Sequence, residues 1–234
     1  MVKSLLVKRS PLRILSKSIH GGLKPGEIGI IAGKKGIGKT ACLVHIATDK
    51  LFQDKHVIHI SYANSVQHLL SWYEDIFREI SKKRNLEDAM DVHEEIIRNR
   101  VILNFHKDGA RTEHVISTLK ALKQDGAFKV DQVVIDGLDA SVLKKEDIEK
   151  FKQGAKELGI SIWFSISTES SEPTPDSDGF PVELTQVKEL TDILLYLIPQ
   201  NNHISIHLLK DREAYKDIDL HLILEPNTLL VVEE

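Results

Sequence analysis

The sequence predicts an α/β protein in which a mainly parallel sheet is flanked by helices and ends in antiparallel strands. Short apolar runs alternate with helical patterns over most of the 234 residues, which is typical of parallel strands joined by helices. Beyond residue 191, strand-like runs follow one another without a helical pattern between them. Consecutive strands with short connections favour antiparallel pairing.

The elements follow from local patterns. Residues 28–32 form a short β-branched run between Pro25-Gly26 and Gly33 and predict a buried strand. Residues 40–52 place their apolar side chains on one helical face. By the same criteria we expect helices at 66–100 (broken near Asn85), 114–124 and 146–158, and strands at 57–61, 101–105, 132–135, 160–166, 192–198, 204–209, 220–224 and 229–232. Residues 169–183 are rich in Ser, Pro, Asp and Gly and predict a flexible acidic loop.

Composition predicts one cytoplasmic domain, 1–234. A hydrophobic content of 41% suffices for one large core. The single cysteine, Cys42, excludes an intramolecular disulfide, fits a reducing compartment and is expected to pack in the core. No apolar run approaches the length of a membrane span. The net charge is −4, but residues 1–20 form a basic arm without an acid, which we expect to be a solvated terminus; its cations are Lys3, Lys8, Arg9, Arg13 and Lys17.

A complete G-x-x-x-x-G-K-[ST] phosphate-binding loop stands between the first strand and the first long helix. We expect nucleotide contacts from Gly33, Lys34, Lys35, Gly36, Ile37, Gly38, Lys39 and Thr40, together with Ala41 behind them. The helix N-terminus offers unpaired backbone N–H groups to a polyphosphate. Lys39 would reach the terminal phosphates as a point charge, and the Thr40 hydroxyl is suited to hold Mg²⁺.

A second half of the site is predicted at the end of a later strand. Val133-Val134-Ile135 is followed by Asp136, so its carboxylate would emerge at the carboxyl edge of the sheet beside the loop. There it would bind a water of the Mg²⁺ shell. Alone the pattern is weak, because many strands end in Asp; together with the loop it predicts a nucleotide site.

These segments resemble the RecA-like P-loop ATPase superfamily, in its KaiC-like and RadA-like branch and in replicative helicases. The resemblance rests on Gly-Gly-Leu-Lys-Pro-Gly-Glu at 21–27, which leads into the loop, on Val-Val-Ile-Asp-Gly-Leu-Asp-Ala at 133–140, and on Leu-Leu-Lys-Asp-Arg at 208–212. It implies a RecA-like core in which strand 160–166 lies between the loop strand and the Asp136 strand. Ser167 or Thr168 would then sense the γ-phosphate. Lys210 and Arg212 would reach in trans into a neighbouring subunit's nucleotide, linking ATP to assembly; otherwise they are ordinary surface cations.

One departure from the family concerns hydrolysis. The glutamate that activates water usually follows the second strand, where this chain has Ala63, or follows the strand-end Asp, where it has Gly137. Neither can accept a proton. The catalytic base is therefore unknown from the sequence. Asn64 could position water, and the candidate substitutes are Glu74, Asp75, Asp139 and Glu169.

Nucleic-acid binding is disfavoured, because loop 169–183 carries acids and no Lys or Arg. The remaining basic candidates are the arm and Lys82-Lys83-Arg84. The eleven histidines show no zinc-like spacing. We therefore expect an Mg-ATP-binding homo-oligomer that uses nucleotide to control assembly or an unknown protein partner, with slow hydrolysis at most. The alternatives are an ATP-driven motor with an unrecognised carboxylate, a DNA recombination or repair accessory, and a small-molecule kinase.

Overall fold

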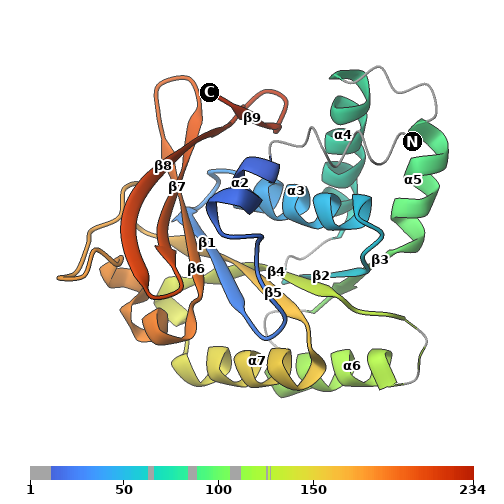
Figure 1. The fold of residues 1–234 in the computed structure, drawn as a ribbon, viewed down its shortest axis with the longest axis horizontal. Coiled ribbons are helices and arrows are strands. Elements are labelled where there is room, and N and C mark those ends of the chain that lie inside the picture. The colour runs from blue at the N-terminus through green and yellow to red at the C-terminus, as the bar shows by residue number, and fades with distance from the viewer. Residues whose placement is uncertain (1–11, 63–65, 84–88, 106–111, 125, 127) are drawn as a thin grey trace.

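A computed structural model describes residues 12–62, 66–83, 89–105, 112–124, 126 and 128–234, without the side chains of 12–14, 83 and 89–92. Its framework is a sheet, in the described residues nine-stranded, of order β3-β2-β4-β5-β1-β6-β7-β8-β9 (Figure 1). The strands are β1 (Ile28–Lys34), β2 (Val57–Ser61), β3 (Arg100–Asn104), β4 (Gln132–Asp139), β5 (Ser161–Thr168), β6 (Ile193–Pro199), β7 (Ile204–Asp211), β8 (Ala214–Leu224) and β9 (Val231–Glu233). The strands from β3 to β6 in this order run parallel, and β7, β8 and β9 are antiparallel.

Helices cover both faces of the parallel part (Figure 1). One face packs on α2 (Leu12–Ser18), α3 (Lys39–Phe52), α4 (Gln67–Lys83) and α5 (Ala89–Arg98). The other face packs on α6 (Thr112–Gln124), α7 (Lys145–Leu158) and the 3-10 helix η2 (Val182–Leu190). Strands β1 and β5 over nearly their whole length, and β4 over its first four residues, are buried on both faces, as their near-continuous apolar sequences require.

The predicted α/β class and most of the elements are confirmed, including strand β5 between β1 and β4. Three features differ from expectation. Strand β6 is not simply part of a hairpin: it runs parallel to β1 and antiparallel only to β7. The helix η2 was not expected. Strand β4 continues past Ile135 to Asp139 with an irregularity in its pairing.

The two segments that composition marked as peripheral contain core contacts. Residues 1–11 of the basic arm lie outside the described residues, but Leu15 and Ile19 are buried on the α3 side. Their spacing of four residues is that of one helix face, so the apolar side chains at the end of the arm pack in the core while Lys17 and His20 stay exposed. In the acidic loop, Phe180 is fully buried and Lys188 pairs with Asp176 at 2.8 Å. These contacts anchor the loop; its flexibility stays a prediction.

Candidate functional site

The Gly-rich loop joins β1 to α3 at the carboxyl edge of the sheet. Gly33, Gly36 and Gly38 have φ angles of 149°, 84° and 101°, which disfavour residues with a side chain. Gly38 is the N-cap residue of α3 and makes no side-chain cap. The N-terminus of α3 therefore meets the loop directly, and Lys34, Lys35 and Gly36 are exposed while Ile37 and Ala41 are buried.

Lys39 folds back over this loop. Its Nζ donates hydrogen bonds of 2.8 Å to Gly33 O and to Lys34 O, and the residue is 7% exposed. Burial lowers the pKa of Lys39 to about 8, against the opposing effect of the Asp136 and Asp139 carboxylates. The ammonium group of Lys39 thus lies where the loop closes. Its hydrogen bonds go to backbone carbonyls, and the carboxylates of Asp136 and Asp139 are close enough to act on its pKa.

Thr40 and Asp136 meet across the sheet edge. Thr40 Oγ1 donates a hydrogen bond of 2.9 Å to Asp136 Oδ2. Ser165 Oγ on β5 donates to Asp136 Oδ1, and Gly137 N donates to Ser165 Oγ at 3.0 Å. A hydroxyl and a carboxylate brought together in this way are hard oxygen ligands of the kind that Mg²⁺ prefers, so the residues fit that ion.

The two residues expected to sense the γ-phosphate, Ser167 and Thr168, lie at the end of β5 and differ in exposure. Thr168 is buried, donates to Ser170 O at 3.1 Å and lies 3.0 Å from the Tyr196 hydroxyl. Ser167 is partly exposed and lines a cavity of about 180 Å³ with Asp139 and Glu169. Ser167 is therefore the candidate whose side chain is accessible to a ligand.

The C-terminal strands contribute contacts to this region that the sequence did not predict. A Cβ at Gly38 would overlap Leu224 Cδ2 at the end of β8. On α3, His45 is buried and its Nε2 lies 2.8 Å from Leu229 O. Val231 N donates to the same nitrogen at 3.3 Å, and burial lowers the pKa of His45 to about 4. The helix behind the loop is thus attached to the C-terminal segment.

The proposed substitutes for a catalytic base are widely separated. Ala63 and Asn64 lie outside the described residues. Glu74 pairs with His93 at 2.7 Å between α4 and α5, and Asp75 pairs with Arg78 on an exposed face. Only Asp139 and Glu169 of the four substitutes border the carboxyl edge of the sheet, where they share a cavity.

Lys210 and Arg212 do not share a face as strand alternation predicted, because β7 ends at Asp211 and Arg212 has a φ of 55°. Both lie near the start of β1, since Asp211 pairs with Ile193 and Ile193 with Gly29. That is the sheet edge opposite their own phosphate loop. Arg212 Nε donates to Glu27 Oε1 at 2.9 Å, and Lys210 Nζ donates to Lys188 O at 2.6 Å. A role in trans would require both to leave these partners and stays a prediction.

A cavity of about 250 Å³ lies on the α6–α7 side of the strand end. Its wall is mainly apolar, with Thr112 donating to Asp147 at 2.8 Å and Lys144 at its border. None of the described residues that line it is an arginine.

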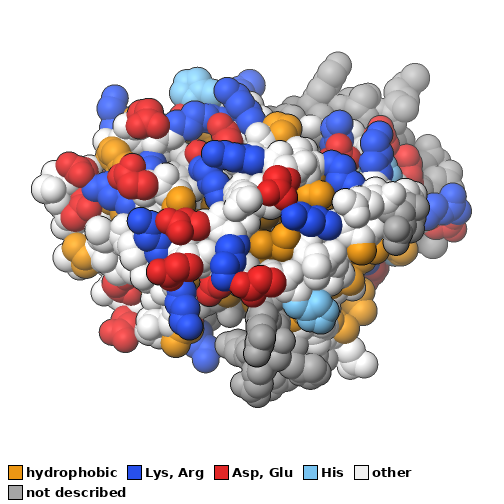
Figure 2. All heavy atoms as spheres, turned by 90° about the horizontal axis from the view of Figure 1, so that it is seen from below, with side chains coloured by type: hydrophobic (Ala, Val, Ile, Leu, Met, Phe, Trp, Pro, Cys, Tyr) orange, Lys and Arg blue, Asp and Glu red, His pale blue; other side chains and the backbone are white. Residues whose placement is uncertain are grey.

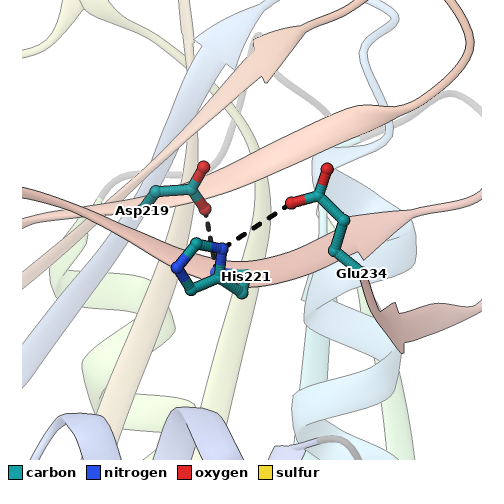
Figure 3. Close-up of side chains that lie close together, drawn as sticks. All are labelled: Asp219, His221 and Glu234. Atoms are coloured by element: carbon teal, nitrogen blue, oxygen red, sulfur yellow. Dashed lines mark hydrogen bonds and ion pairs between the residues drawn. The ribbon is translucent and has the colours of Figure 1, made fainter.

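Asp219, His221 and Glu234 come together on β8 and the chain end (Figure 3). His221 N donates to Asp219 Oδ1 at 2.8 Å, and His221 Nδ1 lies 3.7 Å from Glu234 Oε2. Their potential ligand atoms lie within 4.8 Å of one another, although the sequence showed no zinc-like spacing. All three side chains are exposed, and exposed groups of this kind commonly pair without a metal.

The surface formed by α6 and α7 shows interspersed positive and negative side chains (Figure 2). Ion pairs such as Lys120 with Glu157, at 2.7 Å, neutralise cations on it. A surface of mixed sign offers no continuous basic track for a phosphate backbone. Within the described part of the chain, none of the helices combines the length and apolar character that crossing a membrane requires.

No protein-family model matches this chain, and a comparison with curated proteins found no significant match.

Proposed function

We propose that this chain binds ATP with Mg²⁺ at the carboxyl edge of its sheet and uses the nucleotide to control self-association or the binding of a protein partner. The observation that carries the proposal is the 2.9 Å hydrogen bond between Thr40 and Asp136. It unites a complete phosphate-loop motif with an acid on β4, from another part of the chain. A chance glycine-rich turn would have no reason to lie beside this carboxylate.

The chain's residues have separable roles in this proposal. Backbone N–H groups at the N-terminus of α3 face the phosphates, and Lys39 exchanges its carbonyl partners Gly33 and Lys34 for phosphate oxygens. Thr40 and Asp136 would hold Mg²⁺, which supplies positive charge to the bound phosphates. Ser165 fixes the Asp136 carboxylate.

Slow hydrolysis is part of the proposal. Gly137 occupies one of the usual base positions and forms the irregular part of β4, and Ala63 occupies the other. General-base catalysis contributes about 10² to 10⁴ in rate, so a displaced or weak base suits a nucleotide-controlled switch better than a motor. A motor remains the alternative if steady-state turnover is brisk.

The binding proposal is tested by titrating a fluorescent ATP analogue in the presence of Mg²⁺ into wild type, Lys39→Ala and Lys24→Ala. Lys24 is an exposed lysine ahead of β1 and serves as the matched control. Loss of a charge-assisted phosphate contact costs about 2 kcal/mol, so Lys39→Ala should bind at least about 30-fold more weakly. Lys24→Ala should bind like wild type. Equal affinities for wild type and Lys39→Ala would contradict the proposal.

Control of assembly is tested separately by native mass spectrometry with ATP, with ADP and without nucleotide. ATP should raise the population of oligomers by an amount limited by its differential affinity for the assembled and free states. A strict monomer in all three conditions, with ATP binding intact, would restrict the proposal to partner control.

A further inference from the structure

Strand β4 contains a bulge directly after Asp136. From Ile135 to Leu138 it advances three residues, while the paired segment of β5 advances two, from Phe164 to Ile166. Gly137 lies in this interval with a φ of 99°, which a glycine adopts without strain. Bulges of this kind commonly re-aim side chains beside functional sites.

The bulge determines which face Asp139 occupies. In a regular strand, residues 136 and 139 would project from opposite faces, because they are an odd number apart. Because the bulge adds one residue to β4 between them, the alternation assigns residues 136 and 139 to the same face. Leu138 accordingly packs with Ile166 on the α7 side, so the alternation assigns Asp139, which is paired with Ser167, to the face of Asp136; at the strand end Asp139 also borders the α6–α7 cavity.

The register also gives the position of Asp139 along the sheet edge. Asp139 is paired with Ser167, and Ser167 is paired with Gly33, the first residue of the loop. Two inter-strand spacings of about 4.8 Å place the Cα atoms of Asp139 and Gly33 about 10 Å apart. Asp136 lies one pleat deeper, bonded to Ser165. The Asp139 charge is also near enough to raise the pKa of Lys39 in opposition to burial.

We infer that Asp139 is the catalytic carboxylate of this site, accepting the proton of the water that attacks the γ-phosphate of ATP. The inference rests on the proposed function and deepens it. The water oxygen forms a bond to the γ-phosphorus, and the bond from this phosphorus to the β,γ-bridging oxygen breaks. Its electron pair leaves with ADP, while the water proton passes to Asp139 and then to solvent.

Neighbouring groups orient this carboxylate. Ser141 N and Ser141 Oγ donate to Asp139 Oδ1 at 3.0 and 2.7 Å. Ser167 and Glu169 line the same cavity as Asp139. Glu183 lines this cavity too, but its carboxylate accepts hydrogen bonds from Glu169 N and Ser170 N, so Glu169 is the competing carboxylate that must be compared directly.

The experiment measures single-turnover hydrolysis of γ-labelled ATP, and equilibrium ATP binding, for wild type, Asp139→Asn, Glu169→Gln and Asp147→Asn. Asp147 is the matched control, because it is an aspartate that lines the α6–α7 cavity together with Asp139 but is bonded to Thr112. Asp139→Asn should slow hydrolysis about 10²-fold or more while binding ATP at least as tightly as wild type. Asp147→Asn and Glu169→Gln should retain the wild-type rate within a few-fold.

Retained ATP binding shows that Asp139→Asn is folded at the site. A wild-type rate in Asp139→Asn, a selective loss in Glu169→Gln, or ATP binding without measurable hydrolysis in wild type would each overturn the assignment and leave the binding proposal standing. Failure of wild type to bind ATP would overturn both.

Discussion

Acidification should weaken this fold through His45, the buried histidine of α3. Burial lowers the pKa of His45 from 6.5 to about 4, although the hydrogen bond to Leu229 O opposes the shift. Below pH 6.5 the His45 imidazole is protonated in the unfolded chain, whereas in the folded chain it stays neutral down to a pH of about 4. The stability associated with neutral His45 is therefore complete above pH 6.5 and is lost as the pH falls toward 4.

The size of the effect follows from these values. At pH 5 the solution lies one and a half pH units below the unfolded pKa of 6.5 and above the folded pKa of about 4. Each unit corresponds to about 1.4 kcal/mol, so His45 should account for about 2 kcal/mol of stability lost between pH 7 and pH 5. That is a large share of the 5–15 kcal/mol typical of a domain.

Urea unfolding at pH 7 and pH 5 measures this loss in wild type, His45→Gln and His68→Gln. A glutamine amide can still donate to Leu229 O but does not titrate, so the loss should shrink by about 2 kcal/mol in His45→Gln. His59, which is also buried with a pKa lowered to about 3, is present in all three proteins and cancels. His68 is exposed, and its replacement should leave the loss unchanged. Equal losses in wild type and His45→Gln would refute the reasoning.

Two further predictions concern the sheet and its far edge. Gly29→Ala should lower the free energy of unfolding by about 1–3 kcal/mol, because a Cβ there would come within 3.0 Å of the buried Trp163 ring. The control is Gly154→Ala on α7, where a Cβ would lie 3.4 Å from Ile116, so this substitution should be neutral or stabilising. Chemical denaturation measures both variants, and equal free energies of unfolding would contradict the packing argument. A double-mutant cycle on Arg212 and Glu27 should give a coupling of about 1–3 kcal/mol, because two hydrogen bonds of 2.9 and 3.0 Å join them, whereas the exposed Arg78–Asp75 pair should give at most about 0.5 kcal/mol. No coupling, combined with loss of ATP-dependent association in Arg212→Ala, would support the role in trans instead.

The ion pair between Glu27 and Arg212, at the sheet edge opposite the phosphate loop, shows what the sequence motifs alone do not predict. The segment 21–27 and the triplet 210–212 each carry part of the family resemblance, but nothing in their spacing indicates that Glu27 and Arg212 form an ion pair. They are separated by most of the chain, and only the antiparallel return of β7 beside β6 brings them together. Pairing between distant strands depends on the whole sheet, so local patterns do not encode it.

The sequence by itself determined the alternation of strands and helices and the composition of the phosphate loop, because both depend on neighbouring residues: side-chain periodicity and the backbone freedom of glycine. It also marked Asp136 as the acid that follows an apolar run, although β4 continues to Asp139. Only the tertiary structure decided that β6 joins the parallel sheet, that His45 and Leu224 connect the C-terminal strands to α3 and its loop, and that Asp139 shares a face with Asp136. The glycine at 137 is a local signal for a bulge. Its consequence for Asp139 depends on the register against β5, which is fixed by packing across the sheet.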